Sequence, residues 1–108
     1  MRIEQISPVG LPGVNGITMA GISDGASAAR VKIDIATLQP GSSLPKHPAW
    51  CEQIFYVISG HGRVAGDDDI EHPISAGWAA IWDAGEQHTS WADSVMTVLI
   101  VQRQSETT

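Results

Sequence analysis

The sequence is poor in cysteine and in positive charge. Cys51 is the single cysteine among 108 residues, so an intramolecular disulfide is excluded. Six Lys and Arg stand against twelve Asp and Glu, which gives a net charge of −6. A negative protein is repelled by the phosphates of nucleic acids and of anionic lipid surfaces. We therefore expect neither nucleic acid nor a membrane as a partner.

The sequence also lacks long apolar runs and recognisable targeting segments. The longest apolar run, residues 95–101, is interrupted by Thr97 and is far shorter than the ~18 residues that span a bilayer. Residues 1–10 show neither the basic region nor the apolar region of a secretion signal. These absences predict a cytoplasmic protein.

Several catalytic patterns are missing as well. The sequence has no G-x-S-x-G elbow, no G-x4-G-K-[ST] phosphate loop and no cysteine-rich zinc pattern. Enzymes that use nicotinamide or nucleoside triphosphates are thereby excluded. No window of about 11 residues shows the 3.6-residue period of an amphipathic helix.

Short strand patterns separated by turns are present instead. Residues 29–38 alternate, with Val31, Ile33 and Ile35 on one face, and this alternation predicts a half-buried strand. Residues 54–58 form a β-branched and aromatic run that ends in the turn at residues 59–62. Further strands are predicted around 79–82, 87–91 and 95–102, so we expect one all-β domain over residues 1–108.

Two glycine-framed histidine segments are the most specific feature. The first reads Gly41-x5-His47-x-Ala49-x3-Gln53-x6-Gly60, and the second reads Gly77-x5-Asp83-x-Gly85-x2-His88. This spacing resembles the two motifs of the cupin superfamily, small single-domain proteins included. The resemblance implies an antiparallel jelly-roll β-barrel with its core at about residues 16–103. The chain departs from the cupin motifs at Ala49, Gln53, Asp83 and Ala92, where a His, a Glu, a Pro and an Asn are usual.

The same resemblance implies a metal-ligand set of His47, Gln53 and His88. Three protein ligands leave open positions for water or substrate, as in many catalytic sites. Two further donors are nearby in the sequence: Cys51, which shares the parity of His47, and Glu52 if a bulge shifts the register. The metal would be a divalent ion such as Zn, Fe, Mn or Ni. In the alternative, metal-free interpretation, the two histidines act as general acid and base.

Aromatic residues surround these positions. Phe55, Trp82 and Trp91 are predicted to line a pocket for an organic small molecule, and Asp83 is a candidate to orient His88 from behind. Parity places Trp50 on the outer face of its strand.

Our leading hypothesis is a cupin enzyme of the lyase or isomerase type. It would catalyse proton transfer in an isomerisation, dehydration, cyclisation or lyase reaction, with His47 and His88 as catalytic residues. Two alternatives stay open: an iron-dependent dioxygenase, and a non-catalytic small-molecule binding or sensor module. We also expect a homodimer, with residues 3–9 as a candidate exchanged strand, because open sheet edges invite pairing.

Overall fold

The computed structural model describes residues 1–106, and these residues form eleven β-strands and no helix. None of them therefore lies in a helix that could cross a membrane. The strands are β1 (Arg2–Gln5), β2 (Val9–Gly10), β3 (Thr18–Met19), β4 (Arg30–Leu38), β5 (Ser43–Pro48), β6 (Glu52–Ser59), β7 (His61–Ala65), β8 (His72–Ser75), β9 (Trp78–Trp82), β10 (Gln87–Ala92) and β11 (Met96–Gln104).

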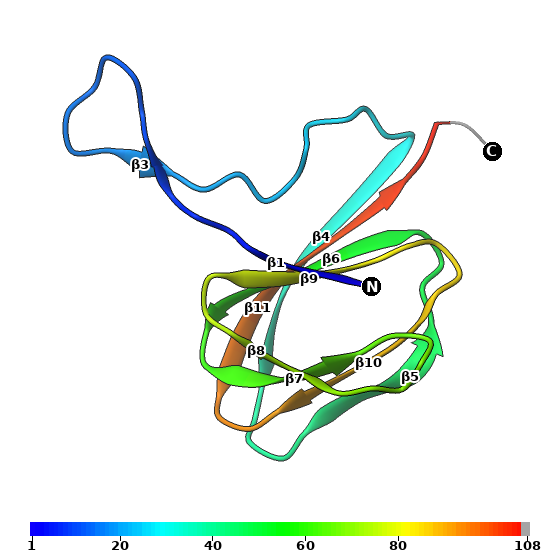
Figure 1. The fold of residues 1–108 in the computed structure, drawn as a ribbon. Coiled ribbons are helices and arrows are strands. Elements are labelled where there is room, and N and C mark those ends of the chain that lie inside the picture. Colours follow the sequence, from blue (N-terminus) through cyan, green and yellow to red (C-terminus); the bar gives the residue numbers. More distant parts are fainter. Residues whose placement is uncertain (107–108) are drawn as a thin grey trace.

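Two antiparallel sheets form the body of the molecule (Figure 1). The larger sheet has the order β1-β9-β6-β11-β4, and the smaller has the order β5-β10-β7-β8. A separate two-stranded ribbon, β2-β3, projects from this body. The all-β, antiparallel class that the sequence predicts is confirmed.

The hydrophobic core lies between the two sheets. Its largest fully buried side chains are Trp82, Phe55 and Met96, each 0% exposed. Both sheets contribute to it, since Val64 and Ile74 come from β7 and β8 of the smaller sheet. Burial of apolar side chains of this size is worth roughly 1.5–3 kcal/mol each, which makes this layer the main source of stability.

The glycines of the two motifs form the turns between strands. Gly41, Gly60, Gly77 and Gly85 have φ between 81° and 89°, in the left-handed region that other residues avoid. At Gly60 a Cβ would also lie 2.0 Å from the carbonyl oxygen of Val95. The spacing between the glycines thus sets the lengths of the strands that carry the histidines.

Strand β4 differs from its prediction in one respect. It forms as expected, but Val31, Ile33 and Ile35 are 54%, 62% and 68% exposed. Their side of the strand is the outer face of the larger sheet, away from the core. The prediction of a half-buried strand with these three residues inside was wrong, because alternation separates two faces without telling which one the rest of the chain covers.

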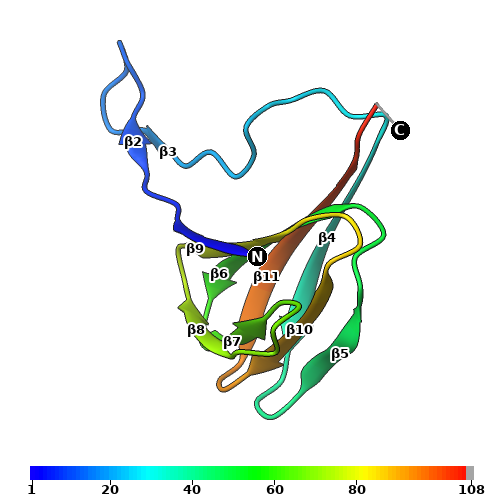
Figure 2. The ribbon, with the colours of Figure 1, turned by 45° about the vertical axis from the view of Figure 1, so that its right-hand side comes forward.

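Residues between β1 and β4 leave the barrel as an arm (Figure 2). With this arm the radius of gyration is 14.4 Å, against about 13 Å for a compact chain of 100 residues. The arm starts after β1, which pairs with β9 of the same chain from Arg2 to Gln5. Three of the seven residues that we considered for exchange, Ile3, Glu4 and Gln5, therefore pair with a strand of the same chain.

Candidate functional site

Strands β5 and β10 bring His47 and His88 side by side. The two residues are directly paired across the antiparallel ladder, and their ring centroids are 4.1 Å apart with an angle of 57° between the ring planes. A register shift follows between His88 and Ser90. Residues that lie 41 positions apart in the sequence are thus joined into one pair by a single strand pairing.

Backbone carbonyls fix the orientation of both rings. The Nδ1 of His47 lies 2.6 Å from the carbonyl oxygen of Pro45. The Nδ1 of His88 lies 3.5 Å from that of Glu86. Because a carbonyl oxygen can only accept a hydrogen bond, Nδ1 carries the proton in each neutral ring. The Nε2 atoms are left with a free lone pair, which is the form that accepts a proton or binds a metal.

The two rings differ in their environment. His88 is 3% exposed, and its Nε2 is buried without a hydrogen-bond partner. His47 is exposed and forms the outer member of the pair. A buried polar atom without a partner costs about 1–3 kcal/mol, so such atoms are rare in folded proteins and mark places where a ligand or function is worth seeking.

The surroundings of His88 favour its neutral form. Burial lowers the pKa of His88 below its ordinary 6.5, and the neighbouring His47 lowers it further. The Glu86 carbonyl and carboxylate act in the opposite direction on this pKa, with smaller effect. His88 therefore presents a neutral, unprotonated Nε2 at pH 7.

Trp82 forms the inner wall beside His88. The two ring centroids are 4.8 Å apart, and Phe55 packs on the far side of Trp82 at 5.8 Å, edge to face. The Trp82 Nε1–H donates a hydrogen bond of 3.2 Å to the carbonyl oxygen of Ala65. Both aromatic residues therefore lie inside the barrel, and Trp82 is in contact with His88.

Gln53 lies on the interior side of the neighbouring sheet. It is 8% exposed and is directly paired with Trp82 across β6 and β9. Paired residues in an antiparallel ladder point to the same face, so Gln53 and Trp82 share the face that looks toward His88. Ala49, at the position where a second histidine is usual, is buried and supplies no donor atom.

The donor set suits a metal ion only in part. Two neutral imidazoles with free Nε2 atoms match what a divalent ion requires. Within residues 1–106, however, no three His, Cys, Asp or Glu side chains gather closely enough to hold an ion. Gln53, on the interior face, offers an amide oxygen as a further donor.

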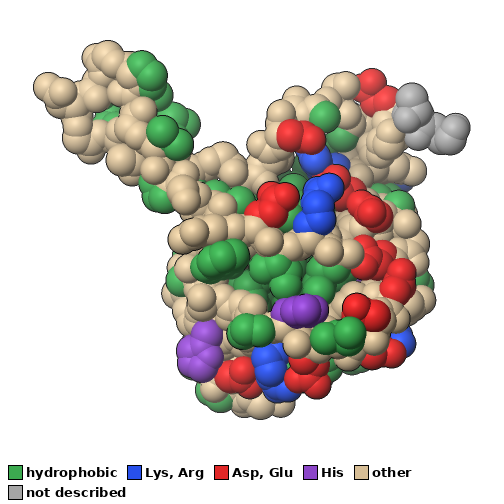
Figure 3. All heavy atoms as spheres, in the orientation of Figure 1, with side chains coloured by type: hydrophobic (Ala, Val, Ile, Leu, Met, Phe, Trp, Pro, Cys, Tyr) green, Lys and Arg blue, Asp and Glu red, His purple; other side chains and the backbone are tan. Residues whose placement is uncertain are grey.

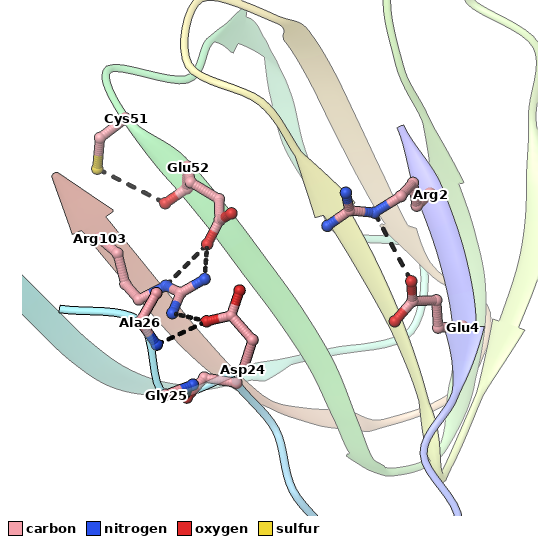
Figure 4. A network of polar contacts seen from close by, with 9 residues as sticks. Arg2, Glu4, Asp24, Gly25, Ala26, Cys51, Glu52 and Arg103 are labelled. Carbon is pink, nitrogen blue, oxygen red and sulfur yellow. Dashed lines mark hydrogen bonds and ion pairs between the residues drawn. The ribbon is translucent and has the colours of Figure 1, made fainter. Parts of the chain in front are cut away.

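The two further donors that the sequence offered do not join the histidines. Cys51 is buried, its thiol donates to the Glu52 carbonyl oxygen at 3.6 Å, and burial raises the pKa of the thiol. The Glu52 carboxylate accepts two hydrogen bonds from Arg103, of 2.8 and 2.6 Å (Figure 4). Its neighbour Gln53 points to the interior, so alternation directs Glu52 outward.

Two other predicted site residues also lie elsewhere. Trp91 is on the outer side of β10, with the Arg63 guanidinium 5.2 Å above its ring, so its assignment to the pocket was wrong. Asp83 is exposed in a turn where its backbone N–H donates to a Glu86 carboxylate oxygen at 3.1 Å. The group behind His88 is the Glu86 carbonyl and not Asp83.

Sequence reasoning missed these carbonyl groups because every residue has one. The only signal is positional: each carbonyl belongs to the residue two places before its histidine.

Comparison with known proteins agrees with this geometry. The family model described as "Cupin domain" matches residues 34–101. A cupin superfamily protein from Desulfitobacterium hafniense is similar in structure, with TM-score 0.66, 15% identity, and coverage of 74% of this chain and 72% of that one. No curated protein is significantly similar in sequence.

Two further similar structures are enzymes by name. A predicted oxalate decarboxylase from Thermotoga maritima has TM-score 0.58 and 25% identity, and the match covers 66% of this chain and 64% of that one. A DMSP lyase from Ruegeria pomeroyi has TM-score 0.64 and 16% identity, and the match covers 72% of this chain and 40% of that one. The jelly-roll fold that the motif spacing implies is confirmed.

Proposed function

The chain belongs to the cupin family, and on this premise we propose that it is a small enzyme that transfers protons on an organic molecule. His47 and His88 would be its catalytic residues. The observation that carries the proposal is the buried, unpartnered Nε2 of His88 beside the exposed ring of His47. Two similar proteins, named a predicted oxalate decarboxylase and a DMSP lyase, support lyase chemistry as the reaction class.

His88 is the proposed general base. Its Nε2 would take the proton, while Nδ1–H keeps its contact with the Glu86 carbonyl oxygen. The imidazolium so formed lies 4.8 Å from the Trp82 ring, within the range of a cation–π interaction. Because burial disfavours this charged form, the proton is returned readily, either to another atom of the product or to His47 at the surface.

A metal ion would use the same atoms. His47 and His88 would hold it through Nε2, with the Gln53 amide oxygen as the third ligand. When bound, a divalent ion would act as a Lewis acid on a carbonyl or carboxylate oxygen of the substrate. Each Nε2 can either bind the ion or accept a proton, so metal occupancy decides which of the two roles the histidines play.

The substrate class follows from these groups. The buried Nε2 of His88 has no hydrogen-bond partner among residues 1–106, and Trp82 offers a flat apolar wall. A small carbonyl compound with an acidic C–H bond suits such a site. Isomerisation and β-elimination both begin with removal of that proton.

Proton abstraction is testable before the full reaction is known. In D2O, we would follow deuterium incorporation into a panel of 2-oxo acids and 1,3-dicarbonyl compounds by proton NMR. Wild-type protein should accelerate exchange for at least one compound at least tenfold over buffer, since a positioned base contributes about 10²–10⁴-fold. His88→Phe should reduce exchange to the level of buffer, and His61→Phe, far from the pair, should keep it.

Metal dependence is measured in the same samples. Metal content per protomer is determined by mass spectrometry on untagged wild-type protein and on His47→Ala. Exchange that persists after chelation assigns the proton-transfer role to the histidines. Absence of exchange for the whole panel, with and without added metal, would contradict the proposal, and oxygen consumption with a ferrous salt would instead favour the dioxygenase.

A further inference from the structure

A row of cross-strand neighbours lies on the interior face of the larger sheet. Each member is directly paired with the next, and the row consists of Trp82 of β9, Gln53 of β6, Gln102 of β11 and Lys32 of β4. Directly paired residues share one face of a sheet. That face is the interior one, because Phe55, two places after Gln53 on β6, is 0% exposed in the core. The row starts at the wall beside His88 and ends at the edge strand β4.

The two amides in the middle of the row have unused hydrogen-bond capacity. Gln53 is 8% exposed, and its side-chain amide forms no hydrogen bond with any of residues 1–106. Gln102 is half-buried, and its Oε1 accepts the Nε1–H of Trp50, while its NH2 group has no acceptor in the described part of the chain. Polar groups in a protein interior are normally paired. Both amides, like the Nε2 of His88, are therefore available to a molecule that enters the barrel.

Trp50 determines which end of the Gln102 amide remains free. The two ends of an amide differ, since the oxygen accepts hydrogen bonds and the nitrogen donates two. An indole N–H can only donate, so the oxygen of Gln102 faces Trp50 and the NH2 group is left as a donor. Gln53 lies on the adjacent strand, and neighbouring strands are about 4.8 Å apart. The larger sheet can thus present two N–H donors side by side, toward the sheet that carries the proton acceptor of His88.

We propose that Gln53 and Gln102 bind the two oxygen atoms of a 1,3-dicarbonyl compound while His88 removes a proton from the carbon between them. This role rests on the proposed function and adds two catalytic residues to it. The C–H bond breaks, a bond from hydrogen to Nε2 of His88 forms, and the electron pair spreads over both oxygens as an enolate. Each oxygen accepts an N–H from one amide, and these hydrogen bonds strengthen as the charge develops. Return of the proton to carbon or oxygen restores His88 without an oxidant or a reductant.

The charges near the row favour a neutral dicarbonyl over a 2-oxo acid. A 2-oxo acid carries a carboxylate before any reaction, and two neutral amides do not compensate that charge. Lys32 is the cation of the row, but its side chain is 65% exposed and its Nζ lies 2.9 Å from an Asp34 carboxylate oxygen. The chain has a net charge of −6, and Figure 3 shows acidic side chains over one side of the barrel. A substrate that arrives neutral and becomes anionic only beside the amides suits this site.

Binding tests the two donors without requiring turnover. We would measure Kd by isothermal titration calorimetry, with chelator present at pH 8, for 1,3-cyclohexanedione, which is then an enolate, and for pyruvate, which has the same charge. Wild-type protein should bind the enolate at least tenfold more tightly than pyruvate. Gln53→Met and Gln102→Met keep the length of the side chain and remove its donors, so each should weaken enolate binding by about 10- to 100-fold, as expected for a lost hydrogen bond to a charged group. Gln39→Met, on the exposed turn between β4 and β5, is the matched control and should leave Kd unchanged.

Trp50→Phe tests the orientation of Gln102 in a variant that should fold, because Trp50 is 56% exposed. Loss of the indole N–H lets the Gln102 amide rotate, so this variant should weaken enolate binding by about two- to tenfold. The same replacement in the Gln102→Met background should have no further effect. Far-UV circular dichroism checks the fold of every variant.

The outcomes separate this role from the proposed function. Wild-type protein that does not bind the enolate, or that binds pyruvate equally well, would overturn the role of the amides. An unchanged Kd in either Gln→Met variant would also overturn it. Enolate binding that depends on both amides, without deuterium exchange in any compound, would support the role in binding and contradict the proposed enzyme. Exchange of a 2-oxo acid that both Gln→Met variants retain would leave the proposed function intact and overturn the role of the amides.

Discussion

Replacing His88 with phenylalanine should stabilise the protein while it removes the proposed base. His88 carries a buried Nε2 without a partner, and phenylalanine removes that atom while keeping a flat ring against Trp82. Loss of the Nδ1–H does not leave the Glu86 carbonyl oxygen without a hydrogen bond, because this oxygen also accepts the Ala49 N–H at 2.9 Å. If His88 served only to stabilise the fold, its replacement would lower the free energy of unfolding.

The magnitude follows from two opposing contributions. Removing an unsatisfied buried polar atom gains about 1–3 kcal/mol, and the slightly larger phenyl ring costs part of this through tighter packing. We expect the free energy of unfolding to rise by about 1 kcal/mol, which corresponds to a rise in Tm of about 4 °C for a domain of this size.

The measurement is urea unfolding followed by tryptophan fluorescence, with chelator present and at equal protein concentration. Both precautions are needed because a bound metal or a dimer would add its own stabilisation to the wild type. His61→Phe, on the exposed side of the β6–β7 turn, is the control and should change stability by less than about 0.5 kcal/mol. A loss of about 1 kcal/mol or more in His88→Phe would refute the reasoning, since it would mean that Nε2 is satisfied in solution.

Two further predictions concern pH and packing. Because the pKa of His88 is lowered in the folded protein, the unfolded chain binds a proton more readily than the folded one. The free energy of unfolding should therefore fall as pH drops below about 6.5. In urea titrations at pH 5 to 8, His88→Phe should lose that part of the pH dependence. Gly62→Ala should lower the free energy of unfolding by about 3 kcal/mol in the same assay, because its Cβ would lie 2.0 Å from the Trp91 carbonyl oxygen. The control is Gly21→Ala, whose Cβ would meet no atom closer than 3.9 Å. This control should leave the unfolding midpoint nearly unchanged.

The motif spacing predicted the histidine pair because the glycines at the turns leave few choices for the strands between them. Gly41 and Gly85 lie at turns before β5 and β10, and these turns set where His47 and His88 fall on the paired strands. Parity then placed Phe55 and Gln53 inside and Trp50 outside, at 56% exposure. The resemblance to the cupin motifs therefore implied the fold and the central pair, and local alternation implied the faces of Phe55, Gln53 and Trp50.

Two errors concern the face of a strand on which a residue lies. Alternation assigns residues to two faces, but the face that becomes covered depends on the rest of the chain. For β4 the sequence suggested burial of Ile33, and the single chain leaves that residue exposed. Trp91 is three positions after His88, so alternation along β10 places it on the opposite face, paired with Arg63 and outward. Its nearness to His88 in the sequence was therefore a misleading signal. The ion pair of Glu52 with Arg103 leaves no trace in the motif spacing.

Gln53 links the fold to the choice between metal and proton chemistry. A carboxylate at this interior position would attract a divalent ion and would also raise the pKa of His88 by stabilising its charged form. The neutral amide does neither, so the histidines keep their free Nε2 atoms unless an ion binds without any anionic ligand. Because binding two imidazoles and one amide leaves the full charge of the ion uncompensated, such an ion is held weakly but polarises a substrate oxygen strongly. The amide would therefore weaken the proposed metal site and preserve the proposed base, and proton transfer is the proposed function that is compatible with both.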